Sequence, residues 1–147
     1  MPDNAQEMFN IMQENVKDTP GIVLPPPVFL EFGGEILETD LEAKTLKARY
    51  PNLPKHRNPV GYLQGGVLVV LMDNTAGPLS FLVAPPSVTV QFNTSYMRPV
   101  TPEDEYIYVT ATVTDTTRRQ LYITVRATNV EGKPFAIGHT VSRIIGE

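Results

Sequence analysis

The sequence predicts an α+β domain in which a curved antiparallel β-sheet wraps around one central buried helix. Segments in the second half alternate apolar and polar residues, which is typical of strands with one buried face. A long apolar segment over about residues 64–82 lacks this alternation, as a buried helix does. With 147 residues and 41% hydrophobic content, residues 1–147 are expected to form a single domain, of which 1–28 are an N-terminal helix and a proline-rich tether.

The N-terminal part is predicted to be a short amphipathic helix followed by an extended connector. Apolar residues recur at helical spacing from residue 4 to 17, and Asn4 with Glu7 three residues later fits a capping box. Thr19-Pro20-Gly21 is expected to end this helix. Pro25-Pro26-Pro27 should then keep the chain extended, because each ring fixes φ and removes a hydrogen-bond donor.

The remaining β regions are predicted from alternation and turn signals. Residues 29–50 should form one or two strands around a turn near Asp40. Four further strands are expected as an antiparallel meander, over residues 87–97, 106–114, 121–127 and 135–145. The buried face of the first of these four should carry Val88, Val90, Phe92 and Tyr96. Thr89 lies on its opposite, polar face.

The apolar segment Val67–Met72 fits a helix or a strand by periodicity alone, and its three valines favour a strand. A helix is favoured by the apolar span, which reaches Ala76, and by the need of a sheet for a cover on its apolar face. Gly65-Gly66 would allow close approach at the start of this helix. Gly77-Pro78 is expected to end or kink it.

Asp73 is the candidate general base or nucleophile, because it directly follows six apolar residues of this helix. Burying a carboxylate without partners is costly, so a functional role is favoured over a place at a wet helix end or as a cap. Gly65 and Gly66 leave backbone N–H groups at the positive end of the helix dipole, where an oxyanion would be stabilised. Tight packing is the alternative role for this glycine pair.

Composition excludes several other classes of function. Cysteine is absent, and His56 and His139 are too few and too far apart for a zinc site, so no metal is expected. A net charge of −4 argues against nucleic-acid binding. There is no run of eighteen apolar residues and no basic segment followed by an apolar one at the N-terminus. We therefore expect no membrane association and a cytoplasmic location.

The segment from Asn58 to Asp73, NPVGYLQGGVLVVLMD, resembles the signature N-x-x-G-x-x-H-G-G-x-x-x-x-L-x-D of hot-dog-fold thioesterases of the phenylacetate-degradation (PaaI-like) type. The stretch from Val90 to Pro99 resembles the first strand after the helix in that family. The resemblance covers about residues 30–146, without a gap from Asn58 to Asp73. It implies the hot-dog fold and an acyl-CoA thioesterase, in which coenzyme A is part of the substrate and no separate cofactor is needed.

The resemblance also implies roles for individual residues. Asp73 would activate the hydrolytic water or attack the carbonyl, and the Gly65 N–H would polarise the thioester oxygen. Asn58 would orient the site, and Thr89 would help to hold the water. Gln64 stands where the family usually has histidine; its amide can donate a hydrogen bond but cannot carry charge or shuttle a proton near neutral pH. Reduced activity or a changed substrate would follow.

The phosphates of coenzyme A require cationic or backbone N–H donors. The candidates for this role are Gly66, Lys55, Arg57, Arg98, Arg118 and Arg119. Of these, Arg118-Arg119 lies at a predicted turn between strands, a usual place for a phosphate clamp. The carrier is expected to be coenzyme A rather than acyl carrier protein, and the sequence does not specify the acyl group.

A homodimer with shared sites is expected from helix geometry. Gly65 and Asp73 are eight residues apart, or about 12 Å along a helix axis, which is too far for both to serve one carbonyl. Two antiparallel helices across a two-fold axis would bring them together. Asn58 and Gly65 would then come from one subunit, and Asp73 and Thr89 from its partner. The resemblance adds that such dimers often pair into tetramers.

Two other functions compete with the thioesterase. Hot-dog hydratases and dehydratases rely on a catalytic histidine with an acidic partner, and their pattern of Asp followed five residues later by His is absent. That class is disfavoured. A non-catalytic protein that binds acyl-CoA or another small ligand stays open, because Gln64 replaces the family's histidine.

Overall fold

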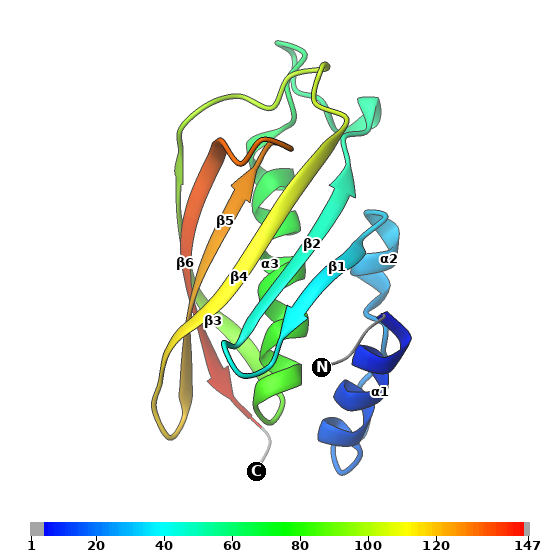
Figure 1. Ribbon diagram of the computed structural model, residues 1–147, viewed down its shortest axis with the longest axis vertical. Helices are drawn as coiled ribbons and strands as arrows, with labels where there is room; N and C mark the ends of the chain where they lie inside the picture. Colours follow the sequence, from blue (N-terminus) through cyan, green and yellow to red (C-terminus); the bar gives the residue numbers. More distant parts are fainter. Residues whose placement is uncertain (1–4, 146–147) are drawn as a thin grey trace.

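A computed structural model describes residues 5–145 of the chain. Figure 1 shows one antiparallel sheet, one long helix against it, and two shorter helices at the N-terminal side. The helical elements are α1 (Ala5–Val16), α2 (Pro27–Glu31), the 3-10 helix η1 (Pro54–His56) and α3 (Gly65–Val83). The strands are β1 (Glu35–Asp40), β2 (Thr45–Pro51), β3 (Ser87–Tyr96), β4 (Tyr106–Thr116), β5 (Gln120–Thr128) and β6 (Pro134–Ile144).

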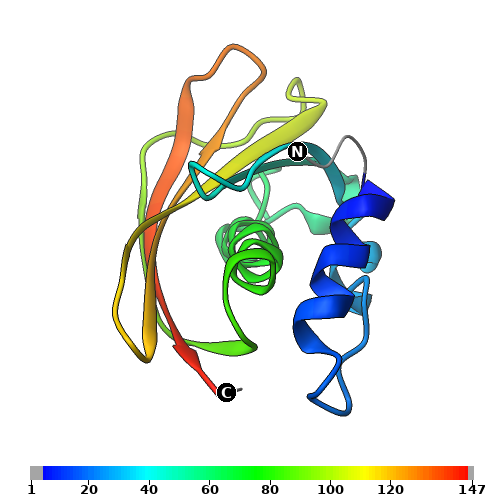
Figure 2. The ribbon, with the colours of Figure 1, turned by 60° about the horizontal axis from the view of Figure 1, so that its bottom comes forward.

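The six-stranded sheet has the order β1-β2-β4-β5-β6-β3, and every neighbouring pair is antiparallel. It curves around α3, and α1 and α2 lie on the other side of that helix (Figure 2). A right-handed twist of each strand gives such a sheet its curvature, and the central helix covers its apolar face. The predicted α+β architecture, a curved sheet around one central helix, is confirmed.

The strand order corrects the predicted meander. Strands β4, β5 and β6 are consecutive neighbours, but β3 pairs with β6 at the far edge of the sheet and not with β4. Residues 97–105, between β3 and β4, form a connection longer than a hairpin loop, so the chain can cross from one edge to the other. Alternation identifies a strand, but it does not say which strand is its neighbour.

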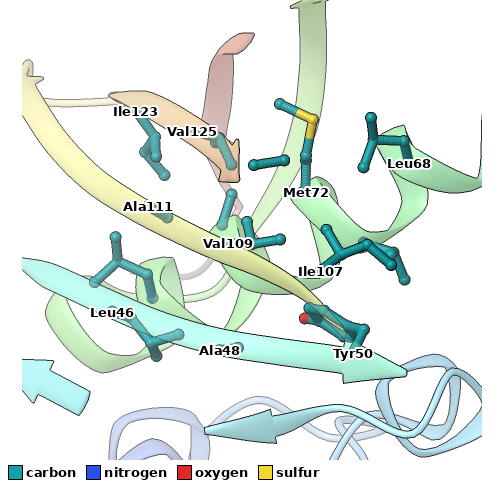
Figure 3. Packing of buried hydrophobic residues seen from close by; sticks show 14 of the residues in the cluster. Leu46, Ala48, Tyr50, Leu68, Met72, Ile107, Val109, Ala111, Ile123 and Val125 are labelled. Atoms are coloured by element: carbon teal, nitrogen blue, oxygen red, sulfur yellow. The ribbon is translucent and has the colours of Figure 1, made fainter. Parts of the chain in front are cut away.

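Helix α3 occupies the centre of the core, as the sequence predicts. Leu68 and Met72 face the strands, close to Ile107 and Val109 of β4 and to Val125 of β5 (Figure 3). All five side chains are almost completely buried. By length and composition α3 is the one helix of the described residues that could cross a bilayer, but it is the core helix under the sheet.

The expectation that α3 is buried on all sides is wrong within one chain. Residues Val69, Val70, Asp73 and Gly77 are only half-buried and form one stripe along the helix. The sheet and α1 pack against the buried residues of α3. We call these four residues the open stripe of α3.

Gly77-Pro78, expected to end or kink α3, does not end it, because the helix continues through Pro78 to Val83. A proline inside a helix removes a hydrogen bond and costs about 3 kcal/mol. Pro78, Leu79 and Leu82 are buried, and tertiary packing of this kind supplies most of the stability of a helix in a protein.

Helix α1 is confirmed, while its predicted N-cap, Asn4, lies outside the described residues. Met8, Met12 and Val16 are buried at a spacing of four residues, so one face of α1 joins the core. Asn15 Nδ2 donates to the carbonyls of Phe81 and Leu82, at 2.9 and 3.1 Å. These carbonyls belong to the last turn of α3, where the helix itself provides no donors.

The proline-rich connector is extended only in part. Pro26 is extended, with φ −60° and ψ 133°, but Pro27 begins the short helix α2. A proline fits the first position of a helix, because its missing N–H has no helical partner there. Phe29, expected in a strand, is therefore helical and buried, and its ring meets that of Tyr50 edge to face at 5.9 Å. A Cβ on Gly34 would lie 2.6 Å from the Phe29 ring, so this contact requires glycine.

Candidate active site

The open stripe of α3 carries Asp73 opposite strand β3. Thr89 Oγ1 donates a hydrogen bond to Asp73 Oδ1 at 3.0 Å. The two residues are sixteen positions apart in the sequence, and the pairing of α3 with the edge strand brings them together. The structure thus joins two of the residues that the sequence nominates for the site.

A β-bulge in β3 turns Thr89 toward α3. The register of β3 against β6 shifts between Thr89 and Gln91, so one extra residue interrupts the alternation of the strand. Before the bulge Thr89 faces the helix, and after it Tyr96 does, because its hydroxyl bonds to Gly65. The expected common face of Val88, Val90, Phe92 and Tyr96 is therefore wrong. Val88 and Val90 are 48% and 52% exposed.

The environment of Asp73 makes its carboxylate a stronger base than an ordinary aspartate. Burial raises the pKa of the Asp73 carboxyl, and the hydrogen bond from Thr89 lowers this pKa in part. A general base works best when its pKa lies closer to the operating pH. The geometry suits Asp73 to accept a proton from a water held near Thr89, or to attack an electrophile directly.

A cavity of about 490 Å³ opens beside Asp73. Its size lies within the range of small-molecule sites, roughly 300–1,000 Å³. Asp73, Asn74, Ser87 and Thr89 provide its polar part. Its remaining lining is largely apolar and consists of Gly21, Ile22, Val23, Pro26, Pro27, Val28, Phe29, Gly77, Pro78 and Phe81.

Gln64 forms the N-cap of α3. The Val67 N–H donates to Gln64 Oε1 at 2.8 Å, which satisfies one of the free donors at the helix start. Within residues 5–145 the Nε2 group of Gln64 has no acceptor, so it can donate to a ligand. A Cβ on Gly66 would lie 2.9 Å from Gln64 Oε1, so any other residue at this position would displace the capping amide.

Tyr96 contacts the same helix end, and sequence reasoning did not assign it a role. Its hydroxyl donates to the carbonyl oxygen of Gly65 at 2.7 Å, and a Cβ on Gly65 would lie 3.2 Å from that hydroxyl. The bond ties the first turn of α3 to the end of β3. Tyr96 therefore holds the Gly65–Gly66 peptide, which directly follows the Gly65 N–H that the sequence predicts as the oxyanion donor.

Asn58 shapes the loop that leads into α3. Its Oδ1 accepts from the Val60 and Tyr62 N–H groups at 3.0 and 3.1 Å, and its own N–H donates to the Tyr62 carbonyl at 2.7 Å. This is the local pattern by which Asn side chains form turns. Gly61 has a φ of +93°, which the turn requires and glycine adopts without strain.

The nominated residues form two groups within one chain. Asn58, Gln64, Gly65 and Gly66 gather at the start of α3, and Asp73 with Thr89 lies two helical turns further on. Gly65 does not line the cavity beside Asp73. A single chain does not bring the Gly65 N–H and the Asp73 carboxylate to one carbonyl.

The nominated basic residues lie at opposite ends of the sheet. Lys55, Arg57 and Arg98 lie near the start of α3, where His56 and Tyr96 hydrogen-bond to Gln64 and Gly65. Arg118-Arg119 is in the turn between β4 and β5, beside the end of β6 (Figure 1). None of these five side chains forms an ion pair within residues 5–145. Across the same residues, no three His, Cys, Asp or Glu side chains are placed to hold a metal ion.

A curved antiparallel sheet around one central helix is the architecture of a hot-dog domain, and here the helix has a glycine-rich start and carries a half-buried acid, Asp73. The family model described as "Thioesterase superfamily" matches residues 60–136, which is more than half of the chain. The chain belongs to the thioesterase superfamily. The predicted class of enzyme, a thioester hydrolase, is confirmed.

Solved structures support the same fold. A phenylacetic acid degradation-related protein from Ralstonia eutropha is 23% identical, with a TM-score of 0.78, and the match covers 91% of this chain and 98% of that one. The PaaI protein of E. coli is 16% identical, with a TM-score of 0.79 and coverage of 95% and 96%. A Streptococcus mutans protein bound to acetyl CoA is 17% identical, with a TM-score of 0.72 and coverage of 78% and 90%. Comparison with curated protein sequences gives no match.

Proposed function

We propose that this thioesterase hydrolyses acyl-CoA thioesters of small or medium acyl or aryl groups, with Asp73 as the general base or nucleophile. The observation that carries the proposal is the pair formed by Asp73 and Thr89 at the polar side of an otherwise largely apolar cavity. An enzyme that hydrolyses a thioester needs a basic group next to the carbonyl carbon of its substrate and an apolar space for the acyl group. The cavity offers both.

In the general-base form of the reaction, the Asp73 carboxylate takes a proton from a water molecule, and the water oxygen attacks the carbonyl carbon. The tetrahedral oxyanion accepts a hydrogen bond from the Gly65 N–H at the positive end of α3. The carbon–sulfur bond then breaks, and the thiolate of coenzyme A leaves and takes up a proton. The products are the free acid and coenzyme A.

In this proposal, the Gly65 and the Asp73 that act on one substrate molecule belong to two different subunits. The open stripe of α3 presents Val69 and Val70 half-buried beside Asp73, and a second copy of α3 would cover them. An antiparallel pair of such helices brings the start of one helix to Asp73 of the other. Asn58 and Gly65 would act with the Asp73 and Thr89 of the other subunit, and dimers would pair into tetramers.

Coenzyme A is proposed as the carrier. The Streptococcus mutans structure with this fold is bound to acetyl CoA, which supports the assignment. Gly66, Arg98 and the pair Arg118-Arg119 are the proposed phosphate contacts. Because they lie at opposite ends of the sheet within one chain, a dimer would have to supply them from both subunits. The cytoplasmic location stays a prediction.

The test is hydrolysis of a panel of acyl-CoAs by the wild-type protein and by Asp73→Asn, followed through release of the free thiol. The variant preserves side-chain volume and removes the basic group. We expect kcat to fall by at least ~100-fold, the usual size of a general-base contribution. Unchanged turnover in a folded Asp73→Asn protein contradicts the assignment of Asp73.

A non-catalytic acyl-CoA binder is the second candidate, because Gln64 caps α3 and cannot transfer protons. This candidate predicts that acyl-CoA binds with no hydrolysis in the wild-type protein. Isothermal titration of an acyl-CoA, with thiol release measured in the same samples, separates the two functions.

A further inference from the structure

One side of the cavity beside Asp73 comes from the N-terminal part of the chain. Residues 21–29 provide Gly21, Ile22, Val23, Pro26, Pro27, Val28 and Phe29 to its lining. We call residues 21–29 the wall segment. It lies outside residues 60–136, which the thioesterase family model matches. The opposite side of the cavity is the second half of α3, with Gly77, Pro78 and Phe81.

The wall segment is fixed to the core at its C-terminal end. Phe29 is 3% exposed, and its ring contacts those of Phe9 and Tyr50 edge to face, at 6.2 and 5.9 Å. Such aromatic pairs contribute beyond their buried area. The wall segment is therefore part of the folded structure and has a defined position relative to α3.

A hydrogen bond from α3 adds a second attachment close to the site. Asn74 Nδ2 donates to the carbonyl of Val28 at 3.3 Å. Asn74 directly follows Asp73 in α3 and is only 8% exposed, although it is polar. One turn of α3 thus presents Asp73 to the cavity and also holds the wall that faces it.

The apolar side chains of the wall segment are left open to solvent. Val23 is 64% exposed and Val28 is 47% exposed, yet both line the cavity. An apolar group bound there would remove their surface from water, which is favourable. On the opposite side, a Cβ on Gly77 would meet no atom within 4 Å, so α3 leaves free space toward the cavity.

We propose that the wall segment is the acyl-binding side of the site and sets which acyl groups are accepted. The apolar chain of the thioester lies between Val23 and Val28 on one side and Gly77 to Phe81 on the other, with the carbonyl at Asp73. Asn74 is a positioning residue that holds the wall through Val28. This rests on the proposed function, and it adds that an apolar acyl group longer than acetyl is the preferred substrate.

The experiment compares chain-length dependence in wild-type protein, in the double variant Val23→Ala with Val28→Ala, and in Val130→Ala. Val130 is the matched control, because it is an exposed valine in the β5–β6 hairpin and does not line the cavity. Substrates run from acetyl-CoA to dodecanoyl-CoA. Each S-alkyl-CoA thioether of the same series, which cannot be hydrolysed, is titrated by calorimetry.

We expect kcat/KM and thioether affinity to rise with chain length in the wild-type and control proteins. Relative to wild type, the double variant should lose about three- to ten-fold more kcat/KM and thioether affinity with octanoyl chains than with acetyl, because buried methylene contacts are removed. Identical chain-length profiles in the double variant and in Val130→Ala overturn the proposal. The wild-type protein could show no hydrolysis of any acyl-CoA and still bind the thioethers with an affinity that depends on the wall segment. In that case the proposed function fails and the acyl-binding role of the wall segment stands.

A second variant approaches the cavity from the other side, in case the double variant does not fold. Gly77→Leu places a side chain in the free space of the cavity, since its Cβ meets no neighbouring atom. We expect kcat/KM for dodecanoyl-CoA and the affinity for its thioether to fall at least about ten-fold more than the same quantities for the acetyl compounds. The proposal is overturned if the change in affinity from wild type is the same for long and short chains in a Gly77→Leu protein with an unchanged circular dichroism spectrum.

Discussion

Thr89 Oγ1 lies 3.0 Å from Asp73 Oδ1 and donates to it, which fixes the one carboxylate on the open stripe of α3. The bond uses one of the carboxylate's acceptor positions and leaves others for a water molecule. Because the bond also lowers the pKa of Asp73, Thr89 adjusts both the direction and the basicity of this group.

Removing this hydrogen bond should change the pH dependence of hydrolysis. In Thr89→Val the pKa of Asp73 is no longer lowered by the hydroxyl, so it rises further above its ordinary value. The acid limb of the kcat/KM profile should move to higher pH, and kcat should fall by about ten-fold, the size expected for a hydrogen bond to a charged group. Thr110→Val, on β4, is the matched control. An unmoved acid limb contradicts the role of Thr89.

Replacing Asp73 by asparagine should stabilise the protein at neutral pH. Burial raises the pKa of Asp73 in the folded state, so the folded protein holds this proton more tightly than the unfolded chain does. Stability from the protonated group is full below the ordinary pKa of aspartate and is lost as the pH rises through the raised pKa. Asparagine does not titrate and can still accept from Thr89. The melting temperature of Asp73→Asn should exceed that of wild type at pH 7, and the two should converge in acid.

Loss of the Tyr96 hydroxyl should affect turnover more than binding. Tyr96→Phe removes the donor to the Gly65 carbonyl but keeps the ring, so the first turn of α3 is held less firmly. We expect kcat to fall several-fold with little change in KM, and the free energy of unfolding to fall by about 1 kcal/mol. Tyr122→Phe removes a comparable hydroxyl bond, to Gln120, at the end of the sheet away from the start of α3. Equal kinetic effects in the two variants would exclude a positioning role for Tyr96.

Two substitutions at Gln64 separate its capping from its chemistry. Gln64→Ala removes the acceptor for the Val67 N–H and should lower the free energy of unfolding by about 1 kcal/mol, as measured by denaturant titration. Gln64→His supplies the residue usual in the resembled family and should preserve or raise turnover on at least one acyl-CoA. A collapse of activity on every substrate would show instead that the pocket is adapted to glutamine.

Mixed dimers test the shared site. Asn58→Ala and Asp73→Asn should each be nearly inactive, and the two are unfolded and refolded together. With random pairing about half of the dimers are mixed, and each has one site with both residues intact, so about a quarter of full activity should return. If both residues of a site come from one chain, every site stays damaged and mixing restores nothing.

The parts of the fold that local sequence determines were predicted well. The strand segments follow from the alternation of apolar and polar residues, and helix α3 follows from the length of its apolar span and from the need of the sheet for a cover. Strand pairing was predicted less well, because it depends on contacts far apart in the chain. The edge position of β3 and the passage of α3 through Pro78 are both decided by tertiary packing.

The candidate site shows the same division. Asp73 stands out locally, because it is a carboxylate in an apolar helix. The direction of Thr89 does not, because it depends on a β-bulge, in which one extra residue reverses the faces of the strand. Tyr96 carries no local signal, since its partner Gly65 lies 31 positions away, and the partner of Asn74, Val28, lies 46 positions away. A polar residue beside an acid within a buried helix, such as Asn74, is the one signal that could have been used.

The two bonds from Asn15 to the last turn of α3 bear on how the protein is handled in the laboratory. A version trimmed to residues 30–147, which keeps all of the family-matched segment, would leave the carbonyls of Phe81 and Leu82 without these donors. It would also expose the apolar surface that Met8, Met12 and Val16 cover. The N-terminal helix thus belongs to the minimal folding unit, and expression of the shorter piece would favour aggregation over a usable enzyme.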